Sequence, residues 1–153
     1  MATSAALCLW RRAATGVEIL IVHPGGPFWA KKDDGAWSLP KGEYDPATEE
    51  GLEAARREFA EETGFEPPDG ATIDLESTRL KSGKHIDAWA VEGDLDADAI
   101  VSNTFEIEWP PRSGRRRSFP EVDRAMWADP DVARVKLNPA QTVFVDRLLD
   151  AIS

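Results

Sequence analysis

Residues 48–63 restrict the fold of this chain more than any other segment, because their apolar side chains recur with helical spacing. At about 100° per residue, one stripe of the predicted helix can face a core. The stripe consists of Leu52, Ala55, Phe59 and Thr63. Thr48 is the predicted N-cap and Gly64 the predicted C-terminal stop. The segment therefore predicts one amphipathic helix that buries a single face.

Three glutamates, Glu58, Glu61 and Glu62, fall within a wedge of about 100° beside this stripe. Like charges at i,i+4 repel by a few tenths of a kcal/mol in an isolated helix, and Arg57 alone cannot neutralise three carboxylates. A solvated acidic face is the usual explanation of a charge run. Because these carboxylates converge at the edge of a buried face, they favour a site for a hard divalent cation such as Mg²⁺, which takes oxygen ligands.

The stretch REFAEETGF at residues 57–65 resembles the core of the Nudix box. Glu49 stands at the family's spacing upstream, and Gly42 corresponds to the opening glycine of the box. Six residues separate Gly42 from Glu49 where the usual pattern has five, so we expect one inserted residue within 43–48. The resemblance covers residues 42–65 and identifies the chain as a member of the Nudix hydrolase family.

This resemblance implies a metal site and its ligands. In the family, the glutamates that match Glu58, Glu61 and Glu62 hold Mg²⁺ or Mn²⁺. The main-chain carbonyl of Lys41 is implied as a further metal ligand. Arg57 is implied to pair with the carboxylate of Glu49. Bound metal ions would neutralise phosphate oxygens and lower the pKa of a bound water.

The resemblance also implies the reaction, hydrolysis of a phosphoanhydride bond in a nucleoside diphosphate linked to a group X. The sequence WSLPKGE at residues 37–43 resembles members that cleave dinucleoside polyphosphates, so we expect a nucleoside or dinucleoside polyphosphate as substrate. The alternative is a Nudix-fold nucleotide-binding or regulatory module without turnover. The intact REFAEE sequence favours the enzyme, because a degenerate box is typical of such modules.

A fourth carboxylate outside the box is common in the family, as a metal ligand or general base. Glu121 fits the spacing to Trp127 that similar sequences show. Glu106 and Glu108 are the rival candidates, and a surface glutamate is the alternative for each.

Candidate substrate contacts are basic and aromatic. The basic run contains Arg112, Arg115, Arg116 and Arg117; of these, Arg115 and Arg117 are expected to hold phosphates, and a solvated hairpin tip is the alternative. Lys41 is another candidate phosphate contact. Trp37, or its neighbours Phe28 and Trp29, could stack on a base, with a loop anchor as the alternative.

The order of expected elements predicts an α/β (mixed α+β) fold, a Nudix-type α/β/α sandwich with a mixed β-sheet, over residues 1–153 as one domain. Expected strands lie at 4–12, 17–24, 37–42, 72–80, 84–93, 104–109 and from 126 onward. Expected helices lie at 48–63, 129–135 and 138–153, the last with Asn138 as N-cap, and residues 112–124 are expected to form a loop.

Composition indicates the partners and the cellular compartment of the protein. The formal net charge of −10 argues against a protein that coats nucleic acid, so we expect no nucleic-acid partner. One cysteine, Cys8, excludes an internal disulfide framework and fits a reducing compartment. No apolar run is long enough to span a bilayer, so we expect a cytoplasmic protein with no membrane partner. His23, His85 and Cys8 are expected to be structural.

Overall fold

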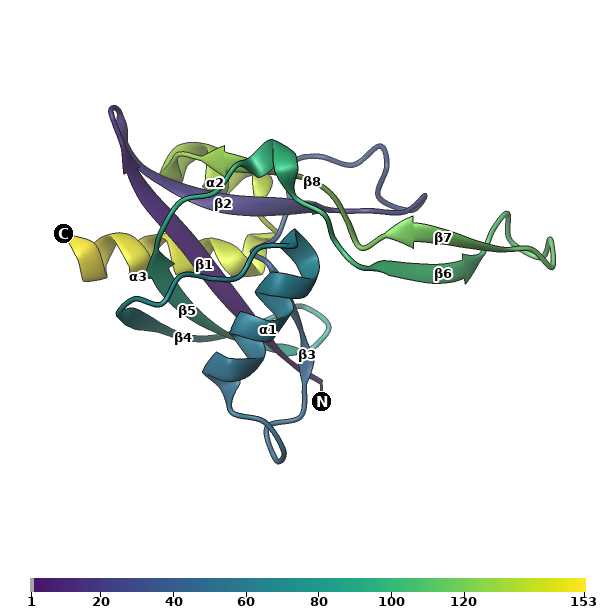
Figure 1. Ribbon diagram of the computed structural model, residues 1–153, viewed down its shortest axis with the longest axis horizontal. Helices are drawn as coiled ribbons and strands as arrows, with labels where there is room; N and C mark the ends of the chain where they lie inside the picture. Colours follow the sequence, from purple (N-terminus) through teal and green to yellow (C-terminus); the bar gives the residue numbers. More distant parts are fainter. Residues whose placement is uncertain (1) are drawn as a thin grey trace.

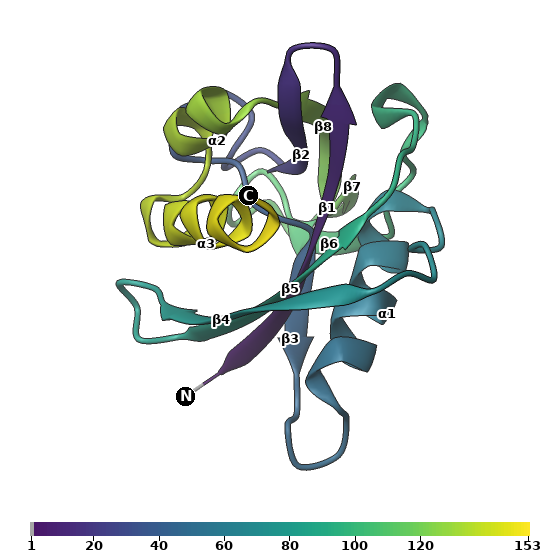
Figure 2. The same ribbon diagram turned by 90° about the vertical axis from the view of Figure 1, so that its left-hand side faces the viewer.

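A six-stranded mixed sheet runs through the centre of the molecule, with helices on both faces (Figures 1 and 2). The computed structural model describes residues 2–153. The strand order is β4-β5-β1-β2-β8, and β3 pairs with β1 beside this path. The pair β1–β5 is parallel and the other pairs are antiparallel. The strands are β1 Thr3–Ala13, β2 Gly16–Pro24, β3 Lys41–Tyr44, β4 Thr72–Arg79, β5 His85–Glu92 and β8 Val122–Ala128.

Strand β1 is buried on both faces, so its alternating side chains contribute to two cores. One core packs against α1 and contains Ala5, Leu7 and Leu9. The other packs against α2 and α3 and contains Ala6, Cys8 and Trp10. This arrangement confirms the expected α/β/α sandwich with a mixed sheet. Burial raises the pKa of the Cys8 thiol to about 12, in agreement with a structural role.

Helix α1 spans Gly51–Thr63 and ends at Gly64, whose φ of 77° gives the left-handed C-cap expected from the sequence. The expected N-cap at Thr48 is wrong. The Asp45 carboxylate accepts a hydrogen bond from Ala47 N, and the Asp45 carbonyl accepts from the backbone N–H groups of Thr48 and Glu49. These bonds form a separate turn before the helix, so the helix begins three residues later than Thr48.

The C-terminal helices cover the opposite face of the sheet from α1 (Figure 2). Helix α2 spans Pro130–Lys136, close to the expected 129–135, and Asp129 is its N-cap. Asn138 caps a short 3₁₀ turn, η2 Pro139–Gln141, and the α-helix α3 follows at Thr142–Ile152. None of the helices within residues 2–153 is long and apolar enough to cross a membrane.

Two sequence expectations between residues 100 and 128 are wrong. The basic segment, expected as a loop, contains β7 Arg116–Pro120, which pairs with β6 Thr104–Glu108 in a separate hairpin that projects from the body (Figure 1). Strand β8 begins at Val122 and not at residue 126. Exposed charged residues in β7 and β8 hide the alternation of apolar and polar residues by which a half-buried strand is predicted.

The strand expected at 37–42 is displaced: Trp37 and Ser38 form isolated bridges, and the ladder of β3 begins at Lys41. The N-terminal half of β1 pairs with β3 and its C-terminal half with β2. The sheet therefore forks between β2 and β3. Leu7 N donates to the Pro40 carbonyl on one side of the fork, and Val22 N donates to the Ser38 carbonyl on the other.

Candidate active site

The fork places the start of β3 directly beside the carboxylates of α1. Lys41 N donates a hydrogen bond of 3.1 Å to Glu62 Oε1. In an antiparallel pair the N–H and C=O of one residue point to the same side. Because the Lys41 N–H points away from β1 and toward Glu62, the Lys41 carbonyl also points away from β1. It is thus available to a ligand on the side of α1.

Glycine is required at position 42 because the Glu58 carboxylate packs closely against the backbone there. A Cβ atom on Gly42 would lie 1.9 Å from Glu58 Oε2, so any other residue would displace that carboxylate. The residue expected to be inserted before Glu49 falls within 43–48, and the hydrogen-bonded turn at residues 45–49 overlaps this segment. Glu58 is 8% exposed, which fixes its carboxylate between the helix and β3.

Arg57 connects the turn before α1 to the helix. Its Nε and Nη2 atoms donate to the two carboxylate oxygens of Glu49 at 2.9 and 2.8 Å. Its Nη1 atom donates to Glu58 Oε1 at 2.7 Å and to Glu61 Oε1 at 3.4 Å. The expected pair of Arg57 with Glu49 is therefore present, and the same guanidinium orients two more carboxylates.

The carboxylates raise one another's pKa values. The pKa of Glu62 is raised to about 8, first by burial and then by the negative charges of Glu121 and Glu58. Burial raises the pKa of Glu58, with a further contribution from Glu61, although the hydrogen bond from Arg57 lowers it. Burial and then the charge of Glu61 raise the pKa of Glu121. All four acids therefore belong to one electrostatic cluster, which a cation would stabilise.

The oxygen donors of this cluster are chemically suited to a hard divalent cation. It offers carboxylate oxygens and one main-chain carbonyl, the ligands that Mg²⁺ and Mn²⁺ accept. Within residues 2–153, however, no three acidic, histidine or cysteine side chains already converge at the spacing of a metal-ligand group. The carboxylate of Glu58 is turned toward Arg57 and that of Glu62 toward Lys41 N. A metal ion at this cluster would require these side chains to rotate away from Arg57 and Lys41 N.

Glu121 lies next to the helix carboxylates, and its rivals do not. A cavity of about 90 Å³ is lined by Glu121, Glu62 and Lys41, among others. Glu106 and Glu108 lie on β6, where Glu108 accepts a hydrogen bond from Arg112 N. The backbone of Glu121 is fixed by hydrogen bonds to Asn103 and Gly25.

An adjoining cavity of about 210 Å³ extends from the same place toward α3. It shares Pro24, Ser38 and Lys41 with the smaller cavity and is also lined by Trp29, Ala36, Trp37, Leu80, Asn138 and Gln141. Trp37 is 4% exposed and donates its Nε1–H to Asp33, so it anchors the loop and forms an inner wall of this cavity. Trp29 is 40% exposed.

Two buried polar residues support this cavity, and the sequence analysis did not assign them to it. Gln141 accepts a hydrogen bond from Leu39 N and donates to Ser38 Oγ. His23 contacts an Asp123 carboxylate oxygen at 2.9 Å and the Lys32 carbonyl at 2.7 Å. The structural role expected for His23 agrees with this geometry. A single glutamine or histidine gives no sequence signal for such contacts.

The two arginines expected to hold phosphates lie farther away. Arg117 is four residues and Arg115 six residues before Glu121 along the projecting hairpin. At about 3.3 Å per residue, Arg115 lies about 20 Å along the strand from Glu121. Both arginines are exposed, and the fold does not bring them into the carboxylate cluster.

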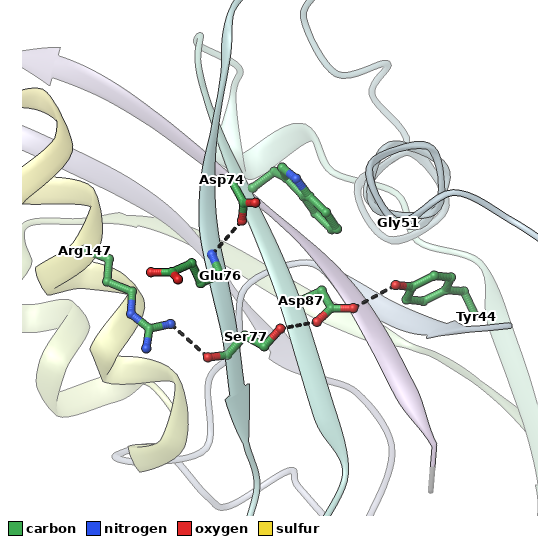
Figure 3. A pocket seen from close by; sticks show the side chains of 8 residues that line it. Tyr44, Gly51, Asp74, Glu76, Ser77, Asp87 and Arg147 are labelled. Atoms are coloured by element: carbon green, nitrogen blue, oxygen red, sulfur yellow. Dashed lines mark hydrogen bonds between the residues drawn. The ribbon is translucent and has the colours of Figure 1, made fainter. Parts of the chain in front are cut away.

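A larger groove of about 590 Å³ lies at the opposite end of α1, near Gly51 (Figure 3). Its polar groups bond mainly to one another: Asp87 accepts hydrogen bonds from Tyr44 and Ser77, and Arg147 donates to the Ser77 carbonyl. None of the site residues expected from the sequence lines this groove. The residues expected to form the site therefore lie at the fork and not in the larger groove.

Solved structures confirm the fold. An Ap4A hydrolase of C. elegans superposes with a TM-score of 0.66 at 18% identity, covering 99% of this chain and 98% of that one. The NUDIX domain of Shewanella oneidensis NrtR, complexed with ADP ribose, superposes with a TM-score of 0.64 at 17% identity, covering 99% of this chain and 88% of that one. At such identities the likeness shows the shared fold.

Sequence comparison gives the family. A "Putative mRNA-decapping protein" of Acanthamoeba polyphaga mimivirus is 32% identical over 90 residues, which cover 53% of this chain and 24% of that protein. The chain thus spans about a quarter of the length of that relative. A family model described as NUDIX domain matches residues 1–148. The chain therefore belongs to the NUDIX domain family, which confirms the family expected from the box.

Proposed function

We propose that this protein is a divalent-metal-dependent pyrophosphohydrolase that cleaves a phosphoanhydride bond in a nucleoside diphosphate linked to X. One observation carries the proposal: Glu58, Glu61, Glu62 and Glu121 form a single cluster of interacting carboxylates, of which Glu62 and Glu121 line a cavity. Nudix hydrolases generally use divalent metal ions, and we propose Mg²⁺ or Mn²⁺ here. The same proposal treats residues 1–153 as one Nudix hydrolase domain.

The metal would be held by Glu58, Glu61, Glu62 and the Lys41 carbonyl, with Glu121 as a further ligand or as the base. When bound, it would supply charge to the phosphate oxygens and acidity to a water. Water attacks one phosphorus, the bond from that phosphorus to the bridging oxygen breaks, and a carboxylate accepts the water's proton. Glu121 suits this last role, because burial raises its pKa above that of an exposed glutamate.

The two neighbouring cavities support a substrate with a nucleoside on one side of the scissile bond. Lys41 lines both cavities and can contact a phosphate between them. Trp29 offers an exposed ring at the larger cavity, on which a base can stack, while Trp37 closes its inner wall. We propose a nucleoside or dinucleoside polyphosphate as substrate, and a nucleotide-capped RNA end as the second candidate, favoured by the mimivirus relative.

The alternative function is a Nudix-fold nucleotide-binding or regulatory module without turnover. The complex of the similar NUDIX domain of NrtR with ADP ribose supports nucleotide binding by this fold. The complete set of box carboxylates in this chain, together with the Gly42 contact to Glu58, favours turnover.

The deciding experiment measures phosphate or nucleotide release from dinucleoside polyphosphates, nucleoside triphosphates, ADP-ribose, nucleotide sugars and capped RNA, each with Mg²⁺, with Mn²⁺ and with EDTA. We expect metal-dependent turnover of at least one compound, abolished by EDTA and by Glu62→Gln. Binding of a nucleotide without turnover under every metal condition would support the module instead.

A further inference from the structure

The register of the β6–β7 hairpin divides its side chains between two faces. Phe105 is opposite Phe119 and Ile107 is opposite Arg117, so these four side chains share one face. The hydrogen bond from Trp109 N to the Arg115 carbonyl continues this register, which places Trp109 and Arg115 on the same face. The cation–π contact between Arg117 and the Phe119 ring, 5.6 Å to its centroid, agrees with this assignment. We call this surface the aromatic–arginine face.

The opposite face of the hairpin is chemically different. Glu106 is opposite Ser118, and Glu108 is opposite Arg116. Each of the two glutamates of the hairpin strands therefore lies on this second face, together with a single arginine. Arg115 and Arg117 are thus separated from the carboxylates of their own hairpin by the pleat of the strands.

Arg115 and Arg117 also lack acidic partners elsewhere in the protein. Among residues 2–153 no carboxylate oxygen lies within 4.0 Å of either guanidinium, and neither donates a side-chain hydrogen bond to a protein acceptor. Other arginines of this acidic chain, such as Arg11, Arg56 and Arg134, form ion pairs. Two charged donors therefore remain free on a surface that also carries aromatic rings.

The loop after β2 extends this surface. A Cβ atom on Gly26 would lie 2.8 Å from the Phe105 ring, so the loop packs closely on the aromatic–arginine face. Phe28 stacks edge-on against Trp109, with ring centroids 5.4 Å apart, yet remains 62% exposed. The loop therefore adds an exposed ring beside the free arginines.

We propose that the aromatic–arginine face, with Phe28, binds single-stranded nucleic acid. Proteins that bind single strands combine a basic track for the backbone with aromatic side chains on which bases stack. Arg115 lies about 20 Å along the hairpin from Glu121, several times the roughly 3.4 Å spacing of phosphates along one DNA strand. The ligand therefore extends well beyond a single diphosphate.

This proposal goes beyond the proposed function, because binding at this face requires neither metal nor turnover. It also differs from the expectation, drawn from the net charge of −10, that the protein has no nucleic-acid partner. Net charge averages over the whole chain, whereas residues 104–120 contain four arginines and only two glutamates. The hairpin that carries these arginines projects from the body of the molecule (Figure 1).

The test is fluorescence anisotropy of a labelled single-stranded RNA of about twelve nucleotides, within the range of known site sizes. The full chain is titrated in EDTA at several salt concentrations. We expect the double variant Arg115→Ala, Arg117→Ala to bind about tenfold or more weakly, and its salt slope to fall by about 1.4, since each phosphate contact on a single strand contributes about 0.7. The matched variant Arg116→Ala, on the other face, should change affinity by less than about twofold.

The variant Phe28→Ala distinguishes binding of nucleic acid from binding of other polyanions. We expect it to weaken binding of the RNA and to leave binding of inorganic polyphosphate unchanged, because polyphosphate has no base to stack. Absence of RNA binding by the wild type at low salt would overturn the proposal. Equal losses in Arg116→Ala and the double variant would also overturn it, as would an RNA affinity unaffected by Phe28→Ala. Glu62→Gln should bind RNA normally, so failure of catalysis and failure of this surface remain distinguishable.

Discussion

Glu62→Gln should stabilise the metal-free protein at alkaline pH. Glu62 is half-buried near Glu58 and Glu121, and its pKa is raised from 4.5 to about 8. A raised carboxyl pKa means that the native state holds a proton that the unfolded state releases. The stability contributed by this proton is fully present below about pH 4.5 and is lost as the pH rises through about 8.

The magnitude follows from the shift. Each pKa unit corresponds to about 1.4 kcal/mol, so the wild type should lose on the order of 4 kcal/mol of unfolding free energy across this window. The amide introduced by Glu62→Gln cannot ionise, and its oxygen can still accept the hydrogen bond that Lys41 N now gives to Glu62 Oε1. The variant should therefore match the wild type near pH 5 and exceed it near pH 9 by a few kcal/mol.

Urea denaturation in EDTA at these two pH values measures the difference. Glu61→Gln is the matched control. It makes the same substitution on the same helix, but at a side chain that is 41% exposed. It should retain the loss of stability that accompanies ionisation of Glu62, because the charges that raise the pKa of Glu62 are those of Glu121 and Glu58. Saturating Mg²⁺ should raise the stability of the wild type more than that of Glu62→Gln. Parallel stability curves for Glu62→Gln and wild type between pH 5 and 9 would refute the proton-holding state of Glu62.

The remaining predictions concern the other members of the cluster. Glu58→Gln should lower turnover by orders of magnitude without unfolding the protein, since it removes a ligand charge; near-normal activity at saturating Mg²⁺ would contradict its assignment. Gly42→Ala should lower turnover because its Cβ would collide with Glu58 Oε2, and crystallography or metal titration can detect the displaced carboxylate. Arg57→Lys should reduce turnover while costing about 1 kcal/mol or less in urea denaturation, because its pair with Glu49 is partly exposed. Glu121→Gln should remove the acidic limb of the pH–rate profile, whereas an unchanged limb would exclude Glu121 as the base.

Local sequence patterns were sufficient for the elements that are continuous in the chain. The spacing of Leu52, Ala55 and Phe59 predicts α1, and Gly64 ends it because glycine adopts positive φ without strain. The box residues predict an acidic site, since three glutamates on one helix face must lie close together in any fold that contains the helix. The hairpins β1–β2 and β4–β5 follow from apolar runs joined by short turns.

Tertiary structure decided which residues from distant segments meet. Glu121 is 59 residues from Glu62, and only the pairing of β8 with β2 brings it to the fork. Its rivals Glu106 and Glu108 have the same charge and a similar distance in sequence, so composition could not separate them. The sequence also could not predict which side chains share a face of the β6–β7 hairpin. A shift of the strand pairing by one residue would move Arg117 to the other face and bring Arg116 into its place. Register depends on backbone pairing between segments, and the charged sequence of β7 carries no alternation from which to read it.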